Sequence, residues 1–202
     1  LFTGQGSQYH GMGETLFAQC PEFREHLKRA IKAVNAHVEE DFEAVYFGGI
    51  GDERIHQTAY TQPALFAFQY ALGSTLKNWG LEPHYAVGHS VGEYAAACLF
   101  GVFCLEDAAR LICARGRLMQ SLPQSGSMLA LQTRPETASR LLYDQPSVAL
   151  GAVNAEQSVV LSGDTAALQK IKIIAEKENI RTKFLKVSHA FHSPLMDPIL
   201  EE

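Results

Sequence analysis

Residues 20–36 carry the first clear pattern of hydrophobic and polar positions in the chain. Apolar side chains recur there every three or four residues with charged side chains between them, which is the pattern of a helix with one buried face. The apolar stripe consists of Phe23, Leu27, Ile31 and Val34. The spacing therefore predicts an amphipathic helix over this segment.

A second helix is predicted from about residue 62 to residue 79. Thr61 and Pro63 favour a helix start, and Gly80 favours a helix end. Between them, the segment ALFAFQYAL is apolar nearly all round, which indicates a helix that is buried on every side.

Strand and helix alternate in the segment that follows. The apolar residues 85–89 predict a short strand, and the alanine-rich residues 91–100 predict a helix. Another helix is predicted over 105–122, where Glu106 and Asp107 occupy the first turn, the end at which the helix dipole favours negative charge. This alternation is typical of an α/β layer architecture.

After Pro123 the pattern changes to that of a small unit of short strands and helices. The predicted order is strand, helix, strand, strand, helix, strand (βαββαβ), which is the order of a ferredoxin-like unit. The predicted strands are 127–131, 147–155, 158–163 and 180–187, and the predicted helices are 134–144 and 165–179.

These patterns predict three segments. We expect a large α/β domain over 1–122, an inserted ferredoxin-like small subdomain over 123–187, and a return to the large domain over 188–202. The chain opens with LFTGQGSQ, which resembles the end of a strand, and closes with PILEE, just inside a predicted helix. We therefore expect it to be a fragment that is truncated at both ends.

Composition and charge exclude several classes of function. The 202 residues are 47% hydrophobic, enough to bury a sizeable core, and the net charge of −5 lacks the basic footprint of a nucleic-acid binder. No apolar run is long enough to span a bilayer, and no positively charged leader is found. The four cysteines form no C-x-x-C pair and three fall in apolar helical stretches, so we interpret them as reduced core residues of a cytoplasmic protein.

The segment GHSVG at 88–92 matches the pattern G-x-S-x-G. Glycine is needed on both sides because a sharp strand-to-helix turn crowds the backbone around the serine. Such a turn exposes the Ser90 hydroxyl at a helix N-terminus, where backbone N–H groups, Val91's among them, can stabilise an oxyanion. We interpret Ser90 as a nucleophile in an α/β-hydrolase-like large domain. The alternative is a tight turn with an incidental serine.

A serine nucleophile needs a base, and His192 is the preferred candidate among the eight histidines. Ser193 and Pro194 follow it and predict a helix start, which helps to keep the imidazole neutral. His189 is the less favoured alternative. A metal site of the type H-x-x-H would lack a third ligand, so we predict no metal. His89 points away from the serine if the segment is a strand, and is interpreted as a packed core residue.

The segment GQGSQYHGMG resembles a nucleotide-binding loop, but Tyr9 stands where the dinucleotide fingerprint requires its third small residue. A glycine-rich turn after a strand can instead bring backbone N–H groups close to a reacting carbonyl. Gln5 is the candidate for a second donor of an oxyanion hole. The alternative, a plain surface turn, is equally favoured by these residues alone.

Arg115 is a charged residue on an otherwise apolar face of the helix predicted over 105–122. That face consists of Ala108, Leu111, Ile112, Leu118, Met119 and Leu122. A guanidinium that faces inward needs an anion to offset its desolvation, and its planar fork suits a carboxylate. The carboxylate is either an internal Asp or Glu or one that arrives with the substrate. The residues alone leave both open.

Taken together, these residues resemble the acyltransferase domain of a type I polyketide synthase, in the malonyl-CoA:acyl carrier protein transacylase family. The likeness covers essentially the whole chain. In family order it includes GQGSQ, TQPALFAFQYAL, VGHSVGEYAAA, ARGRLMQ, GAVNAEQSVVLSG and VSHAFHSPLM. It implies that Ser90 is acylated, that His192 is the base, that Arg115 binds the free carboxylate of malonate, and that Gln5 and Val91 supply the oxyanion N–H groups.

The resemblance also implies a substrate preference and partners. The HAFH sequence and the small Val91 are similar to those of malonyl-selective members, in which Phe191 would fill the room that an α-methyl group needs. Arg115, Phe191 and His89 are the expected substrate-binding residues. The expected reaction moves a malonyl unit from malonyl-CoA to the phosphopantetheine thiol of an acyl carrier protein, with a ketosynthase domain in the same polypeptide. No bound cofactor, nucleic acid or membrane is expected.

Two further interpretations come from the same residues. A basic cluster is a candidate face for an acidic carrier protein, although a solvated helix face and strand edge is the favoured interpretation. It consists of Lys170, Lys172, Lys177, Arg181, Lys183 and Lys186. The rival function is an α/β-hydrolase-type serine esterase or thioesterase, but that class expects an acid between serine and histidine and an HGGG-type loop.

Overall fold

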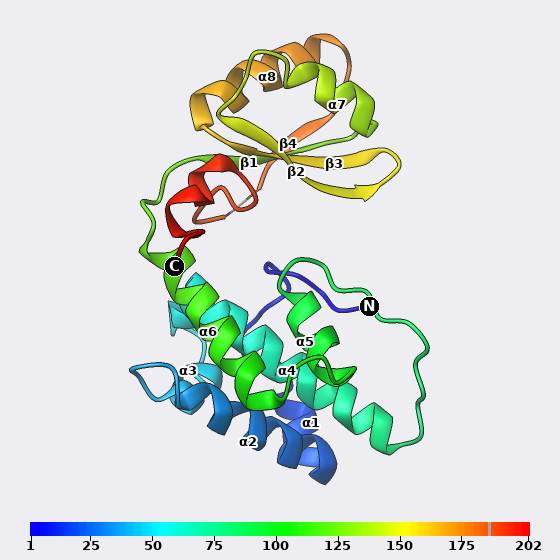
Figure 1. Ribbon diagram of the computed structural model, residues 1–202, viewed down its shortest axis with the longest axis vertical. Helices are drawn as coiled ribbons and strands as arrows, with labels where there is room; N and C mark the ends of the chain where they lie inside the picture. Colours follow the sequence, from blue (N-terminus) through cyan, green and yellow to red (C-terminus); the bar gives the residue numbers. More distant parts are fainter. Residues whose placement is uncertain (186) are drawn as a thin grey trace. The chain divides into compact units, whose positions relative to one another are not determined.

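The computed structural model describes residues 1–185 and 187–202 and divides into two compact units, Leu1–Gln120 and Ser121–Glu202 (Figure 1). The two units are described separately. Residues 188–202 group with the second unit by their contacts. Their predicted return to a large domain, and the domain limits at 122 and 187, remain predictions.

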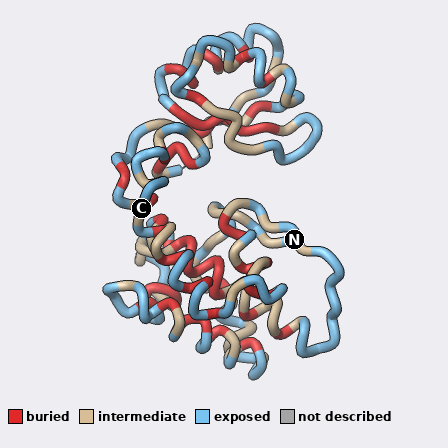
Figure 2. The backbone as a smooth tube through the Cα atoms, in the orientation of Figure 1, coloured by how far each residue is buried: buried red, intermediate tan, exposed pale blue. Residues whose placement is uncertain are grey.

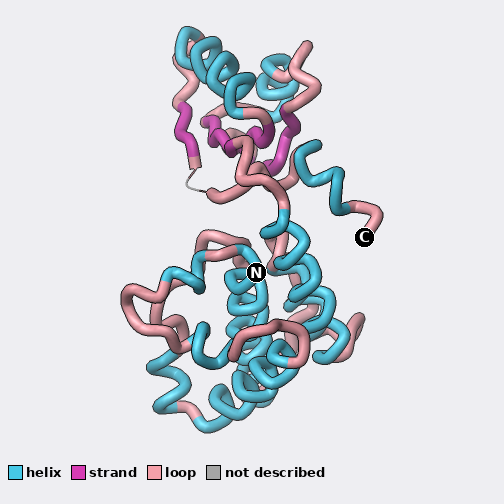
Figure 3. Tube along the Cα trace, turned by 90° about the vertical axis from the view of Figure 1, so that its left-hand side faces the viewer, coloured by secondary structure: helices cyan, strands magenta, loops and turns pink. Residues whose placement is uncertain are grey.

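The first unit consists of helices and connecting loops, apart from one isolated β-bridge (Figure 3). Its elements are α1 (Glu14–Gln19), α2 (Pro21–Asn35), α3 (Phe42–Tyr46), the short 3-10 helix η1 (Glu53–His56), α4 (Thr58–Asn78), α5 (Gly92–Leu99) and α6 (Leu105–Ser121). Among the described residues, no helix combines the length and the apolar character needed to cross a bilayer.

Helices α2 and α4 form the centre of the first unit. The predicted stripe of α2 is fully buried, and α4 is buried along most of its length, as its apolar sequence predicts (Figure 2). Helix α4 begins at Thr58, four residues before the predicted start, so Pro63 lies inside it. The Tyr60 and Thr61 N–H groups donate to the Gln57 carbonyl and form its first turn. Pro63 has no N–H group, so the hydrogen bond to the Ala59 carbonyl, four residues earlier, is missing.

The predicted strand at 85–89 is reduced to a single parallel bridge between Phe2 and Gly88. The Phe2 N–H donates to the Val87 carbonyl, and the His89 N–H donates to the Phe2 carbonyl, both at 2.9 Å. No other described segment pairs with these residues, so the backbone is extended without a ladder. His89 is exposed, and its interpretation as a packed core residue is wrong.

The second unit contains a four-stranded antiparallel sheet in the order β2-β3-β1-β4. Its elements are β1 (Ser127–Leu131), α7 (Pro135–Leu141), β2 (Val148–Ala155), β3 (Ser158–Gly163), α8 (Thr165–Lys177), β4 (Thr182–Phe184) and the 3-10 helix η2 (Pro194–Ile199). The predicted strand and helix order over this stretch is therefore confirmed, although the last strand is shorter than the predicted 180–187.

Helices α7 and α8 cover one face of this sheet and form its core (Figure 1). The strand register brings Leu150, Leu161, Leu129 and Phe184 opposite one another in a row across all four strands. Strand β2 is irregular at Gly151, which has no Cα partner in the ladder, and a Cβ there would lie 3.7 Å from the Cβ of His192. The segment around His192 therefore lies beside this irregular part of β2.

Two predictions about buried residues are corrected by helix α6. Leu111 is 42% exposed, so it does not belong to the buried stripe, which instead includes Ala109, Cys113 and Gly116. Cys104 is also exposed, because it precedes the helix, and its Sγ accepts from the Asp107 N–H in the first turn.

Burial raises the pKa of the Cys98 thiol to about 11 and that of Cys113 to about 12, so both are protonated core groups.

Truncation of Leu161 tests the core of the second unit. Leu161 is completely buried in the central strand β3. We expect Leu161→Ala to lower the free energy of unfolding by about 2–5 kcal/mol, because it leaves a cavity under α7 and α8. In the same sheet, Val153 is 53% exposed, and Val153→Ala is expected to cost about 1 kcal/mol or less. Urea unfolding followed by circular dichroism gives both values, and equal losses would contradict this core.

Candidate active site

Ser90 stands at a sharp turn that only glycine neighbours permit. Its φ of 52° lies in the left-handed region, which costs a non-glycine residue about 1–3 kcal/mol. A Cβ at Gly88 would lie 2.1 Å from the Glu93 nitrogen, and a Cβ at Gly92 would lie 2.5 Å from the Phe2 carbonyl oxygen. Helix α5 begins immediately after this turn. The predicted elbow between an extended segment and a helix is therefore present.

The glycine-rich segment at the start of the chain packs directly against this turn. Phe2 forms the bridge with Gly88. Gly4 lies so close to His89 that a Cβ on Gly4 would lie only 2.5 Å from Nδ1 of His89. The amide side chain of Gln5 is held from the other side, because its Nε2 donates to Oγ1 of Thr58 at 3.2 Å and its Oε1 accepts from Gln62 at 3.4 Å. The segment around Gln5 is therefore fixed beside the serine turn and is not a plain surface loop.

Two backbone N–H groups at this turn are available as donors. Within the described part of the chain, neither the Gln5 N–H nor the Val91 N–H donates to a backbone or side-chain acceptor. Val91 is 1% exposed and is the N-cap of α5, where backbone N–H groups point out of the helix. Such donors stabilise negative charge on an oxygen that forms next to them.

Arg115 points toward the serine. Its Nη2 donates to Oγ of Ser90 at 3.4 Å and its Nη1 donates to Oε1 of Gln62 at 2.7 Å. The guanidinium also lies over the ring of Tyr94, with Cζ 5.6 Å from the ring centroid. These contacts bring the predicted nucleophile and the predicted carboxylate-binding group together in one place.

No carboxylate of the described residues forms an ion pair with Arg115. Its partners are a neutral amide, a hydroxyl and an aromatic ring. Burial lowers the pKa of the guanidinium, an effect that the neighbouring Tyr94 partly opposes. Of the two alternatives that the sequence left open, an internal acid and an acid on the substrate, the first is absent from the described part of the chain.

Two residues of this site were not singled out from the sequence. Gln62 is 1% exposed and joins Gln5, Arg115 and Met119, whose Sδ accepts from Nε2 of Gln62 at 3.3 Å. Tyr94 lies in the first turn of α5. The sequence could have indicated Gln62. It is a polar residue in a helix that is predicted to be buried on every side, and a buried polar side chain needs hydrogen-bond partners.

Gly116 explains how α6 approaches α4 closely enough to form these contacts. A Cβ there would lie 3.1 Å from the Thr58 carbonyl oxygen and 3.3 Å from Cα of Ala59, in the first turn of α4. The neighbouring residue Arg115 is thereby brought within reach of Gln62, one turn further along α4.

In the second unit, His189 and His192 have different surroundings. His189 is completely buried, with Nδ1 2.9 Å from Oγ of Ser188 and Nε2 2.9 Å from the Leu122 carbonyl oxygen. Both ring nitrogens therefore already have partners. His192 is exposed and has a left-handed φ of 57°. The predicted helix start after it is present as η2, where Oγ of Ser193 accepts from the Leu195 N–H at 3.3 Å.

The remaining predicted site residue is Phe191. It is 7% exposed, and its ring centroid lies 5.8 Å from that of His189. Its predicted role in substrate choice stays a prediction, as does the substrate-binding role of His89.

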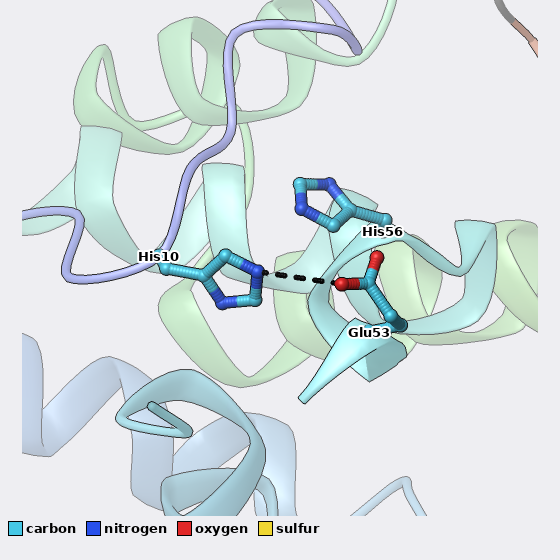
Figure 4. Close-up of side chains that lie close together, drawn as sticks. All are labelled: His10, Glu53 and His56. Carbon is cyan, nitrogen blue, oxygen red and sulfur yellow. Dashed lines mark ion pairs between the residues drawn. The ribbon is translucent and has the colours of Figure 1, made fainter. Parts of the chain in front are cut away.

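Metal-ligating side chains do not gather at Ser90 or Arg115. Within the described ranges, the one group of three or more His, Cys, Asp or Glu side chains whose ligand atoms lie close together is His10, Glu53 and His56 (Figure 4). No sequence pattern indicated this group, because its members come from two separate segments.

Adding one methyl group to the serine turn tests its geometry. We expect Gly88→Ala to lower the free energy of unfolding by at least about 1–3 kcal/mol, because its Cβ would overlap the first turn of α5. Gly49 is the matched control, since it is exposed and a Cβ there meets nothing within 4 Å, so Gly49→Ala should stay within about 0.5 kcal/mol of the parent. Chemical denaturation measures both. Equal stability of the two variants would show that the turn is not as tight as described.

Known proteins are similar to this chain in both sequence and structure. A family model of the acyl transferase domain matches residues 1–202. Polyketide synthase GfsA of Streptomyces halstedii is 43% identical over 207 residues, which is 100% of this chain and 3% of that protein. Phenolphthiocerol synthesis polyketide synthase type I Pks15/1 of Mycobacterium marinum is 43% identical over 202 residues, which is 100% of this chain and 10% of that protein.

Solved structures agree with these relatives. The acyltransferase domain from the second module of the salinomycin polyketide synthase has a TM-score of 0.93 at 40% identity, over 99% of this chain and 47% of that one. The malonyl CoA-acyl carrier protein transacylase from Clostridium perfringens has a TM-score of 0.88 at 30% identity, over 98% of this chain and 63% of that one. This mixed α/β chain therefore belongs to the acyltransferase domain family found in polyketide synthases.

Proposed function

We propose that the chain transfers a malonyl unit from malonyl-CoA to the phosphopantetheine thiol of an acyl carrier protein, through an ester on Ser90. The observation that carries this proposal is Arg115, which is half-buried without an acidic partner among the described residues and lies 3.4 Å from the serine hydroxyl. A site for an acyl group that ends in a carboxylate needs a cation at this place.

In the first half-reaction, Ser90 loses its proton to a base and attacks the thioester carbonyl. The carbonyl oxygen becomes negative, and the free N–H groups of Gln5 and Val91 are the donors that would hold it. The tetrahedral intermediate then collapses, and the thiol of coenzyme A leaves with a proton. The product is an acyl ester on Ser90.

We assign the base to His192, which lies in the second unit. The resemblance to the family motif and the surroundings of the two histidines support this assignment. His189 already uses both ring nitrogens in hydrogen bonds with Ser188 and Leu122. A base must exchange its proton freely, so a histidine with both nitrogens engaged in the core is poorly suited.

In the second half-reaction, the pantetheine thiol attacks the ester on Ser90. His192 takes the thiol proton and returns a proton to Ser90 as the new thioester leaves. The acceptor is an acyl carrier protein, and a ketosynthase domain in the same polypeptide is the expected neighbour. The similarity to the malonyl CoA-acyl carrier protein transacylase from Clostridium perfringens supports this acceptor and this acyl group.

The basic cluster is a weaker part of this proposal. Lys172 already forms an ion pair with Glu176 at 2.6 Å, which favours a solvated helix face over a docking surface. Lys186 lies outside the described residues. We also propose a cytoplasmic location, an α/β-hydrolase-like large domain and a ferredoxin-like small subdomain.

The choice of malonyl over methylmalonyl is proposed for Phe191. A buried phenyl ring beside the acyl group would occupy the space of an α-methyl substituent. One methyl group changes binding in an apolar pocket by only about 1–3 kcal/mol, so the expected preference is modest.

The rival function is that of a serine esterase or thioesterase, in which water accepts the acyl group. An ester without a carboxylate has no group to pair with Arg115. The free energy spent on removing the Arg115 charge from water would then not be recovered when the substrate binds. Arg115 therefore favours transfer of a carboxylated acyl group.

Covalent loading tests the nucleophile. Incubated with malonyl-CoA, the protein should gain one malonyl group by intact mass, and Ser90→Ala should gain none, because the ester oxygen is missing. Ser7→Ala is the matched control, since Ser7 is an exposed serine of the glycine-rich segment. Loading that survives Ser90→Ala would refute the assignment. Free malonate formed faster than the ester accumulates would favour the hydrolase.

Substrate competition tests Arg115. We expect Arg115→Ala to lower kcat/KM for malonyl-CoA by about 10²–10³-fold, since truncation of one partner of a buried charge pair costs about 2–5 kcal/mol. The value for acetyl-CoA, which lacks the carboxylate, should change little. Arg110→Ala on the exposed face of α6 is the control. Equal losses for both thioesters would show that Arg115 does not bind the carboxylate.

A further inference from the structure

A second group of side chains in the first unit has the composition of a metal site. His10 comes from the loop that follows the glycine-rich segment, and Glu53 and His56 come from the 3-10 helix η1. One ligand atom from each lies within 4.8 Å of the other two. Figure 4 shows the carboxylate of Glu53 and the rings of His10 and His56 pointing toward one another.

The geometry of η1 places two of these ligands on one side. A 3-10 helix has about three residues per turn, so residues i and i+3 lie directly above one another. Glu53 and His56 have this spacing and therefore project from the same face. His10 approaches this face from the other segment, with its Nε2 4.0 Å from Oε1 of Glu53.

Both segments are held firmly, so the three side chains stay near one another. The side chain of Asp52 caps η1 by accepting a hydrogen bond from the Arg54 N–H. The hydroxyl of Thr61 donates a hydrogen bond to the carbonyl oxygen of Ile55, a buried residue of η1. On the other side, the buried hydroxyl of Tyr46 donates to the carbonyl of Met12, two residues after His10. The backbone that carries the three side chains is therefore held in place before any ion binds.

The local charge favours a cation. Arg54 is the nearest positive side chain in the sequence, but it is paired with both Asp52 and Glu40. Three carboxylates, those of Glu40, Asp52 and Glu53, thus accompany a single guanidinium. The net charge of these four side chains is −2, and Glu53, whose side chain is 76% exposed, is the carboxylate that does not pair with Arg54.

Each imidazole has one nitrogen that an ion can reach. Nε2 of His10 lies 4.0 Å from Oε1 of Glu53, a distance too long for a hydrogen bond, so coordination through Nε2 would not break that contact as a hydrogen bond. The amide of Gln8 lies 3.4 Å from Nδ1 of His56, which leaves Nε2 of His56 for an ion. A metal-bound imidazole keeps its proton on the other nitrogen, so the Gln8 amide would have to turn its oxygen toward this ring.

We propose that His10, Glu53 and His56 bind one divalent transition-metal ion, of which Zn²⁺ is the best match. Two imidazole nitrogens and one carboxylate oxygen are ligands that Zn²⁺ prefers, with water in the fourth position. Tetrahedral bonds of 2.0–2.2 Å separate the ligand atoms by about 3.3 Å, so the present group must contract by roughly 1 Å. The exposed side chain of Glu53 has the freedom to make this movement.

Binding would connect the ion to the candidate active site. His10 lies five positions after Gln5 in the same segment. An ion on His10 and His56 would therefore tie this segment to η1 at His10. It would stabilise the folded state by an amount that grows with the logarithm of the free ion concentration once that concentration exceeds the dissociation constant.

The test titrates zinc chloride into the full, chelator-treated protein and follows heat release. We expect one equivalent to bind, and binding to weaken about tenfold or more in Glu53→Gln and in His56→Gln. Both side chains are exposed, so both variants should fold. His37→Gln, at an exposed histidine outside the group, is the control and should bind as the parent does. Cobalt(II) absorption in the visible range reports the same site independently of any activity.

Metal ligands must be deprotonated, so the affinity for zinc should fall as the solution is made more acidic. Absence of saturable binding at neutral pH would overturn the proposal. So would weak binding of several equivalents that is equal in the parent, Glu53→Gln and His56→Gln, because it would reflect scattered surface histidines.

Discussion

The candidate active site depends on the guanidinium of Arg115, which the fold places beside Ser90 without an acidic partner among the described residues. Arg115 is half-buried, and among the described residues its hydrogen bonds go to the neutral Gln62 and to Ser90. Removing a charge from water without a counter-ion costs free energy, and this cost is recovered when an anion arrives. Gln62 keeps the guanidinium in place because it is itself held by Gln5 and Met119. One buried amide thus joins the carboxylate-binding group to the segment that supplies an oxyanion donor.

Close contacts at glycine bring these groups together. Gly4, Gly88 and Gly92 let the first residues of the chain lie directly against the serine turn, and Gly116 lets α6 lie against the first turn of α4. At each of these positions a Cβ would meet a neighbouring atom at 3.1 Å or less. The four glycines belong to segments that carry Gln5, Ser90 or Arg115, so the spacing of the reactive groups is a consequence of backbone packing. The rest of the first unit, centred on α2 and α4, supplies the rigid support.

Local patterns predicted local features well. The serine turn, the helix after it, the amphipathic helix α2 and the strand order of the second unit all follow from signals within a few residues of one another. Contacts between distant residues were out of reach. Gln62 and Arg115 are 53 positions apart, and nothing in either segment specifies that they meet. The strand expected at 85–89 failed because a strand needs paired neighbours, and among the described residues only Phe2 pairs with it. The group formed by His10, Glu53 and His56 was missed because His10 is far from the other two residues in the sequence.

The most direct measurement is a crystal structure of the protein carrying a malonyl ester on Ser90. The account predicts that the free carboxylate accepts from the Arg115 guanidinium at about 2.7–2.9 Å, with the contact between Arg115 and Gln62 retained. The carbonyl oxygen of the ester should face the N–H groups of Gln5 and Val91. A carboxylate that points into solvent, or that is held by another residue while Arg115 stays on Gln62, would contradict the account.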